Sequence, residues 1–198
     1  MRRLSRIAPL ALALGLSACS LGGLLGGGKP PPTLLTLTPE AAAPAELART
    51  ATAGNAVTIA VPVIPKELRS LRIPAQVGPT DVAYIKGVQW VDTPDRLFKD
   101  LVAETVRRVT GRVVIDPRQA GLDPGIVISG QLRRFGFDEA EGAVIVSYDA
   151  AMATDGGARV QTRRFEARAP ATGDASVGPA LNQAANRVAL DVANWIGG

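Results

Sequence analysis

The first nineteen residues decide which part of this chain is left to fold. Three arginines lie within the first six positions, the apolar run 7–16 follows, and small residues lead from it to Cys19. A cationic start, a short apolar run and small residues before a cleavage site are typical of a secretory signal peptide. The run is also shorter than the roughly 20 residues that a membrane-spanning helix needs. We therefore predict that residues 1–18 are removed and that the folded protein is built from 19–198.

The predicted cleavage site has a cysteine where an ordinary signal peptide has any small residue. The sequence Leu16-Ser17-Ala18-Cys19 resembles a lipobox, the recognition sequence of bacterial prolipoproteins. This resemblance implies that the Cys19 thiol receives diacylglycerol, that the chain is cut before Cys19, and that the new amine is acylated with a fatty acid such as palmitate. Three acyl chains anchor a protein firmly, whereas one binds only marginally. Ser20, and not Asp, follows the cysteine, which implies delivery to the outer membrane, with the domain in the periplasm. A plain signal peptide with a chance cysteine is the alternative.

The amino-acid composition argues against most kinds of enzyme. Histidine is absent, and Cys19 is the only cysteine. Ser-His-Asp and Cys-His catalysis, histidine-bound zinc and the usual general base near neutral pH are therefore excluded. A single cysteine also forms no intrachain disulfide and no multi-thiolate metal site. We expect a protein that is not an enzyme and that has no cofactor or metal, although an enzyme built on carboxylates or lysine alone stays open.

The charge balance gives no support for nucleic-acid binding. The sequence has 22 basic and 18 acidic residues, a formal net charge of +4, but three of the basic residues and none of the acidic ones lie in 1–18. The mature chain would carry 19 basic and 18 acidic residues, a net charge of +1. Nucleic-acid-binding domains usually show a clustered basic excess, so nucleic acid is not an expected partner.

The mature chain divides into a tether and one domain. Residues 20–28 are rich in Gly and Leu, and three prolines follow Lys29, a composition typical of an extended linker. We predict a flexible lipidated tether over 19–56, in which the weak alternation at 33–37 is consistent with a short strand. The remaining residues, 57–198, have the length of a single domain.

Within this domain, alternating apolar residues predict strands and a period near 3.6 predicts helices. The first helix begins near Pro94, ends before Gly111 and has an apolar face; the second begins near Ser176. The chain Thr154-Asp155-Gly156-Gly157 predicts a hairpin turn. Strands are expected at 57–63, 82–85, 88–91, 112–115, 126–137, 143–153 and 159–167. The last three strands form an antiparallel meander, and the pattern predicts an α+β fold in which two principal helices pack on one face of a mainly antiparallel sheet.

Two pairs of adjacent arginines are the main candidates for a binding surface: Arg133-Arg134 and Arg163-Arg164. They could lie near each other on the sheet and meet anionic lipid headgroups or an acidic partner. A solvated sheet edge is the simpler interpretation of the same residues. Trp90 is a further candidate for partner or lipid contact, but Trp90 and Trp195 are more typical of core anchors.

Two other motifs carry less weight. Residues 23–29 match most of a P-loop, but Pro30 stands where the Mg²⁺-binding Ser or Thr belongs, and a strand before and a helix after it are missing. The carboxylates Asp138, Glu139 and Glu141 could support acid-base chemistry if burial separated their pKa values. A solvated hairpin turn is the favoured interpretation of the three.

The order of these motifs resembles the ABC-type transport auxiliary lipoprotein family. Residues 59–65 and the following 67–68 are similar to the family's opening strand and its Pro-x-x-Leu turn. Residues 82–84, which lead to 89–90, are similar to the family's strand that ends in Trp. Residues 96–101 are similar to the helix that follows this strand. The lipobox, the Pro-rich tether and the C-terminal helix also fit, so the resemblance covers nearly the whole mature chain. Leu35 stands where members often have Tyr, and Gln89 where many have Arg, which leaves the subfamily open.

The resemblance implies a function in lipid transport. Such lipoproteins accompany an ABC permease, its ATPase and an MCE-domain protein, which together are thought to move phospholipids or other hydrophobic molecules between the inner and outer membranes. This chain would be the non-catalytic, outer-membrane part that docks the periplasmic MCE assembly, and a homo-oligomer is plausible because MCE proteins form rings. Two alternatives stay open: a lipoprotein that itself binds a lipid or small apolar ligand between sheet and helices, and an envelope-structural or assembly lipoprotein.

Overall fold

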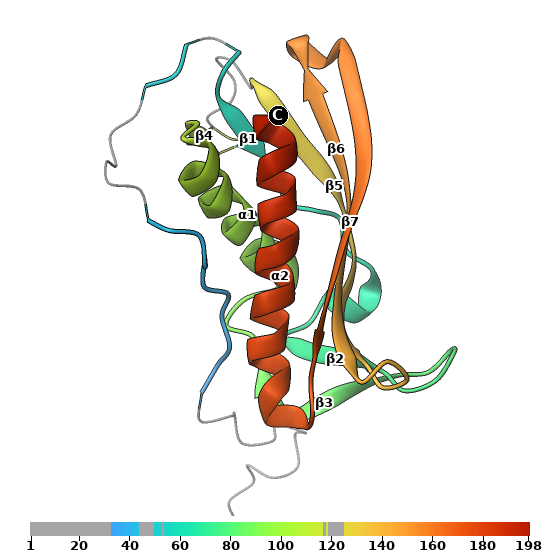
Figure 1. The fold of residues 1–198 in the computed structure, drawn as a ribbon. Helices are drawn as coiled ribbons and strands as arrows, with labels where there is room; N and C mark the ends of the chain where they lie inside the picture. Colours follow the sequence, from blue (N-terminus) through green and yellow to red (C-terminus); the bar gives the residue numbers. More distant parts are fainter. Residues whose placement is uncertain (1–32, 44–49, 53, 117, 119–124) are drawn as a thin grey trace, which may run out of the picture. The chain divides into compact units, whose positions relative to one another are not determined.

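The computed structural model describes residues 33–43, 50–52, 54–116, 118 and 125–198 (Figure 1). The predicted signal peptide, the predicted lipidation site Cys19, the P-loop-like residues 23–29 and the first part of the predicted tether lie outside the described residues. Among the described residues, no helix has both the length and the apolar character that crossing a bilayer requires.

The described chain forms one seven-stranded sheet with two helices packed on one of its faces (Figure 1). This confirms the predicted fold class. The helices are α1 (Pro94–Thr110) and α2 (Asp174–Gly197), with short 3-10 turns at η2 (Lys66–Leu68) and η3 (Asp155–Gly157). The strands are β1 (Val57–Ile59), β2 (Arg72–Gln76), β3 (Val82–Gln89), β4 (Val114–Ile115), β5 (Ile126–Asp138), β6 (Ala143–Thr154) and β7 (Arg159–Pro170).

Strand β5 organises the sheet because both of its edges are occupied. One edge pairs with β6, which pairs in turn with β7, and this antiparallel meander is the predicted one. The other edge is shared by β1 and β2, and both run parallel to β5. The parallel pairs were not expected from the sequence. They follow from the path of the chain, because α1 carries it across the sheet before it returns in β4 and β5, and parallel neighbours need such a crossover.

The core between sheet and helices contains a chain of four aromatic rings. Trp90 packs on Phe135 at 5.5 Å between ring centroids, Phe98 lies 6.3 Å from Phe135, and Phe98 meets Tyr148 edge-on at 5.2 Å. Helix α2 contributes mainly small side chains, which let it approach the sheet and α1 closely. Its buried alanines are Ala180, Ala184, Ala185, Ala189 and Ala193.

The predicted elements differ from the observed ones at three places. Strand β2 was not predicted, because Pro74 interrupts its pattern; the register shifts between Arg72 and Pro74, which accommodates the proline. The strands predicted at 82–85 and 88–91 are one strand, because Gly87 adopts a positive φ of 74° that absorbs the expected bend. The strand predicted at 57–63 ends at Ile59, ahead of Pro62.

Residues 34–41, which belong to the predicted tether, are attached to the folded domain, and we call them the strap. Leu35 donates its N–H to the Gln89 carbonyl at 2.8 Å and accepts the Val91 N–H at 2.9 Å, which forms a single parallel bridge to Trp90. The Leu35 side chain lies over Gly178 of α2, where an added Cβ would come within 3.0 Å of Leu35 Cδ2. The strap therefore begins at the N-terminal end of α2.

Two asparagines of α2 hold the rest of the strap. Asn182 Oδ1 accepts the Thr38 N–H at 2.8 Å, and Asn186 Oδ1 accepts the Glu40 N–H at 2.8 Å. Asn186 Nδ2 donates to the Thr38 carbonyl at 2.9 Å, and Asn182 Nδ2 to Glu40 Oε1 at 3.1 Å. Side-chain amides thus take the place of a neighbouring strand and satisfy both donors and acceptors of an extended backbone.

Candidate interaction surface

The arginines singled out from the sequence lie on β5 and β7, but they do not form one group. Successive residues of a strand face opposite sides of the sheet, so Arg163 and Arg164 are separated. Arg164 lies on the face away from the helices, opposite Asp149 of β6. Arg163 lies on the helix side, with its guanidinium 5.3 Å from the centre of the Phe165 ring.

On the helix-free face, Asp149 joins Arg164 and Arg133. Arg164 donates to both carboxylate oxygens of Asp149, with Nη2 to Oδ2 at 2.8 Å, and Arg133 Nη1 lies 3.4 Å from Oδ2. The hydrogen bond from Arg164 is the main reason that the pKa of Asp149 lies below its usual range. Two of the four candidate arginines therefore meet, but through an acidic residue that already neutralises part of their charge.

Arg134 has a partner of its own at the end of β5. Its Nη2 donates to Asp138 Oδ2 at 2.6 Å, and Asp138 Oδ1 accepts the Glu141 N–H at 3.1 Å. The hydrogen bond from Arg134 holds the pKa of Asp138 below its usual range. A general acid at neutral pH needs a raised pKa, so Asp138 is suited to closing the β5–β6 turn and not to proton transfer.

The other acids of this turn also make structural contacts. Glu141 accepts from Arg168 Nε of β7 at 2.7 Å, which ties the turn to the neighbouring strand. Glu139 donates its backbone N–H to the Gln76 carbonyl of β2 at 3.0 Å. Among the described residues, no group of three or more Asp, Glu, His or Cys side chains gathers closely enough to hold a metal ion.

Trp90, which the sequence offered as a candidate for partner or lipid contact, is buried. Its side chain is 0% exposed and lies at the centre of the aromatic core, so it does not reach a partner or lipid surface. Its Nε1 is buried without a hydrogen-bond acceptor among the described residues. Trp195 pairs with Phe165 at 5.5 Å and is partly exposed beside the edge of β7.

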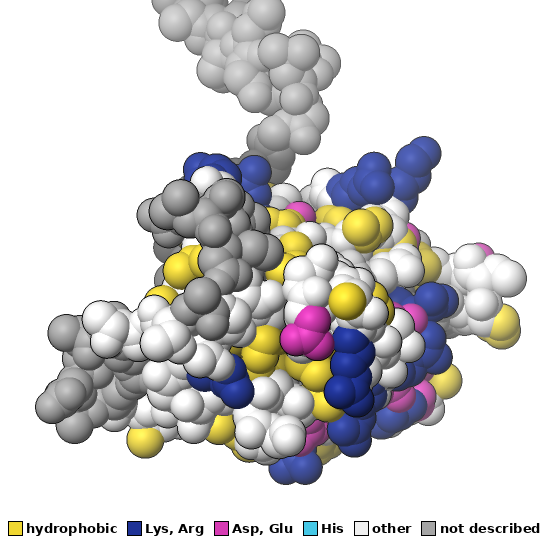
Figure 2. Space-filling view, turned by 90° about the horizontal axis from the view of Figure 1, so that it is seen from above, with side chains coloured by type: hydrophobic (Ala, Val, Ile, Leu, Met, Phe, Trp, Pro, Cys, Tyr) yellow, Lys and Arg dark blue, Asp and Glu magenta, His cyan; other side chains and the backbone are white. Residues whose placement is uncertain are grey.

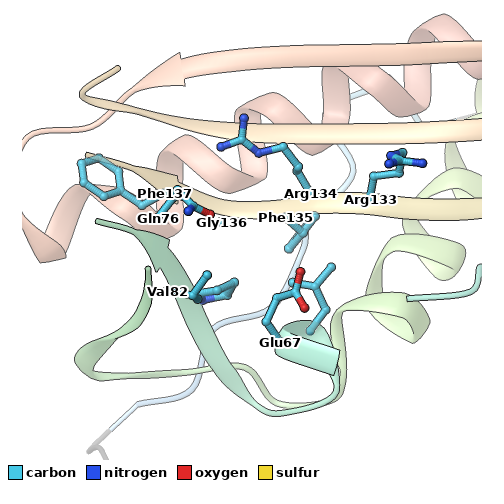
Figure 3. Close-up of a pocket in the computed structure, with 10 residues that line it drawn as sticks. Glu67, Gln76, Val82, Arg133, Arg134, Phe135, Gly136 and Phe137 are labelled. Atoms are coloured by element: carbon cyan, nitrogen blue, oxygen red, sulfur yellow. The ribbon is translucent and has the colours of Figure 1, made fainter. Parts of the chain in front are cut away.

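A small cavity opens on the sheet between η2, β2, β3 and β5 (Figure 3). Glu67, Gln76 and Val82 line one side, and Arg133 and Arg134 the other. Its volume is about 60 Å³, whereas sites for small organic ligands usually have roughly 300–1,000 Å³. This cavity does not hold a phospholipid chain.

A larger, open groove runs along the outer edge of β7, beside the C-terminal half of α2. Its volume is about 490 Å³, and it is lined mostly by polar and charged side chains, with the Phe165–Trp195 pair at its base. The cations that line it are Arg163, Arg164 and Arg187, and the acids are Glu166 and Asp191. Viewed from above, Lys and Arg side chains gather in a band on one side of the domain, with acidic side chains between them (Figure 2). No signal in the sequence pointed to this groove, because β7 and α2 form it only after folding.

Comparison with solved structures gives the same fold in two proteins. An uncharacterised protein superposes with a TM-score of 0.63 at 14% identity, over 73% of this chain and 93% of its own. Protein XCC0632 from Xanthomonas campestris, described as a member of the DUF330 family, superposes with a TM-score of 0.67 at 19% identity, over 82% of this chain and 93% of its own. At these identities the likeness concerns the fold alone.

Comparison of the sequence itself identifies the family. No curated protein sequence matches the chain. The family model for the ABC-type transport auxiliary lipoprotein component, however, matches residues 35–193, from the first bridged residue of the strap to the last turns of α2. The chain therefore belongs to the family of ABC-type transport auxiliary lipoprotein components.

Proposed function

We propose that this protein is a non-catalytic docking component, anchored in the outer membrane through acylated Cys19, that receives the periplasmic MCE-domain assembly of an ABC-type phospholipid transport system. The observation that carries the proposal is the family match over residues 35–193. The described residues support a binding function over a catalytic one, because the pKa-shifted acids near the candidate arginines are all lowered by ion pairs.

The tether gives the domain reach. Cys19 and Leu35, the first bridged residue of the strap, are 16 positions apart, and an extended chain of that length spans about 55 Å. A weak interface then suffices, since anchoring both partners in the same envelope raises their effective concentration. The accessible candidates for the interface are Arg133, Arg134, Arg163 and Arg164. A homo-oligomer is compatible with this function.

A capture experiment tests the proposal. The lipidated protein is cross-linked mildly in the cell envelope and purified in detergent, and its partners are identified by mass spectrometry. Cys19→Ala, which removes the lipid anchor, serves as the control. We expect an MCE-domain protein or ABC permease to be enriched only with the lipidated form.

The same purification covers the alternatives. Bound phospholipid in the absence of an ABC or MCE component would replace the docking function with lipid binding. Enrichment of outer-membrane barrel proteins alone would indicate an envelope-assembly role. Either result would refute the proposed docking function and leave the family assignment unchanged.

A further inference from the structure

The longest free edge of the sheet is that of β7. Its twelve residues pair with β6 and with no other described strand, from Arg159 opposite Thr154 to Pro170 opposite Ala143, in a register without a bulge. Proteins usually shorten, bulge or cover such an edge, because it offers a row of unpaired backbone groups to another strand.

The hydrogen-bond alternation shows which residues present these groups. Ala171 donates its N–H to the Gly142 carbonyl at 3.1 Å, so the pair after it, Pro170 with Ala143, is a non-bonded pair, as a proline requires. Inward and outward residues then alternate along the ladder. The backbone groups that face the free edge belong to Val160, Thr162, Arg164, Glu166 and Arg168.

The two sides of this edge differ in charge. On the helix-free side, Arg164 is bonded to Asp149, and Arg168 to Glu141 and Glu166. On the helix side, Arg163 contacts only the face of Phe165 and has no carboxylate partner among the described residues. In the groove between β7 and α2, Arg187 is paired with Asp191. Among the described cations there, the positive charge without a carboxylate partner is therefore that of Arg163, beside the Phe165–Trp195 pair.

We propose that this edge binds an extended segment of a partner protein, which pairs as an additional strand with β7 and places acidic side chains over the groove beside Arg163. This inference rests on the proposed docking function and names the chemistry of the docked segment. Strand addition derives affinity from backbone hydrogen bonds and specificity from alternate side chains. The aromatic pair and Arg163 would contact one face of the segment, since alternate residues of a strand point to one side.

A second copy of the chain does not supply such a segment through its own edge strands. Strand β7 itself carries four arginines and one glutamate, so two copies would oppose like charges. Strand β3, the other long free edge, contains Lys86 and no acidic residue. Charge complementarity therefore favours a different, acidic chain.

The test uses the full-length lipidated protein in detergent and two fluorescein-labelled twelve-residue peptides. Glutamate alternates with threonine and valine in one peptide, and lysine replaces every glutamate in the other. We expect the glutamate peptide to bind at least about tenfold more tightly by fluorescence anisotropy. In hydrogen exchange it should slow the amides of Thr162, Arg164 and Glu166.

Variants separate strand pairing from charge attraction. Thr162→Pro removes one outward N–H without touching the ladder to β6 and should weaken binding about fivefold to tenfold, whereas Thr162→Val should leave it unchanged. Arg163→Glu should abolish binding, whereas Arg96→Glu, an equal change of charge on the exposed side of α1, should change it by less than about twofold. Equal binding of both peptides, or unchanged exchange along β7, would overturn the inference even if Thr162→Pro failed to fold.

Two further outcomes keep this inference apart from the proposed function. If Thr162→Pro dissociates an oligomer in sedimentation while neither peptide binds, the edge serves a second copy and the inference is wrong. If the glutamate peptide pairs with β7 but the envelope capture yields no MCE or ABC component, the edge site stands and the proposed function fails. If the envelope capture succeeds equally with the wild type and with Thr162→Pro, the proposed function stands and the inference about the β7 edge fails.

Discussion

Asn186 is the residue through which the attachment of the strap can be tested most directly. Its side chain is 6% exposed, accepts the Glu40 N–H and donates to the Thr38 carbonyl. Asn186→Ala removes both hydrogen bonds, and each is worth about 0.5–1.5 kcal/mol net. The expected loss of unfolding free energy is therefore about 1–3 kcal/mol. It cannot exceed the free energy that holds the strap, because beyond that point the strap detaches and the rest of the domain stays folded.

A matched control removes the effect of helix propensity. Alanine is favoured over asparagine within a helix by roughly 0.6 kcal/mol, which partly hides the loss. Asn194 is exposed on the same helix, and the structure gives its side chain no hydrogen bond to the strap. Asn194→Ala thus measures the propensity gain alone, and the difference between the two variants isolates the strap contacts.

Urea unfolding and hydrogen exchange provide the two readouts. With a slope of about 2 kcal/mol/M, the midpoint of Asn186→Ala should fall by about 0.5–1.5 M relative to Asn194→Ala. The Glu40 amide should exchange at least about tenfold faster, while the Leu35 amide, bonded to Gln89, keeps more of its protection. An unchanged Glu40 amide, or equal midpoints for the two variants, would show that the asparagine contacts do not hold the strap.

Three other perturbations follow from the structure. Gly130→Ala should cost roughly 3 kcal/mol or more, because φ is 155° there and a Cβ would lie 2.0 Å from the Asp149 carbonyl oxygen. Thermal unfolding measures the difference from Gly197→Ala, where a Cβ would meet Thr110 Cγ2 at an ordinary contact distance of 3.6 Å. Burial raises the pKa of the Tyr148 hydroxyl well above its usual range, so the folded state holds that proton more tightly than the unfolded state does. The resulting stabilisation is complete below about pH 10 and is lost as the pH rises further. The stability of Tyr148→Phe should therefore fall less steeply with pH above that point, as alkaline unfolding measures. Arg164→Gln should raise the pKa of Asp149 toward its ordinary value. The lowered pKa in the wild type stabilises the fold above about pH 4, and this stabilisation is lost as the pH falls below that value. The unfolding temperature of the variant should therefore depend less on pH in the acid range.

Local patterns were sufficient for the elements whose partners are near in sequence. Helix α1 combines a first-turn proline at Pro94 with Gly111 in the left-handed conformation at its end, φ 69°, and both signals are visible in the sequence. The β6–β7 hairpin likewise follows from alternation on both sides of the turn at Asp155. These features need no knowledge of the rest of the chain.

The strap could not be predicted because its partners lie far away in sequence. Thr38 and Asn182 are 144 residues apart, and Glu40 and Asn186 are 146 apart. An asparagine within a helix gives no indication that its amide bonds an extended segment, and the alternation of leucine and threonine in the strap indicates an extended chain but not its partner. The candidate arginines were only partly predictable for a related reason. The alternation of side chains along a strand predicts that Arg163 and Arg164 lie on opposite faces of the sheet. The contact of Arg133 with Asp149 depends on the register shift between Leu132 and Arg134, which the sequence does not indicate.

Leu35, where the strap begins, and the β7 groove lie toward opposite ends of α2, and this bears on the proposed anchoring and docking. Leu35 contacts Gly178 near the start of the helix, whereas Trp195, beside the β7 groove, lies in its last turn. The rise of an α-helix places these residues about 25 Å apart along its axis. If Cys19 carries the proposed lipid anchor, the anchor pulls on the Leu35 end of the domain while the strap is attached, and the groove lies toward the other end of α2. If the strap detaches, Ala56 still attaches the chain to the sheet, because it accepts the Ile126 N–H at the opposite end of the sheet, beside β1 and β4 (Figure 1). The anchor would then pull from the end near the groove. Under the proposed anchoring, the hydrogen bonds of Asn182 and Asn186 therefore determine at which end of the domain the tether leaves it.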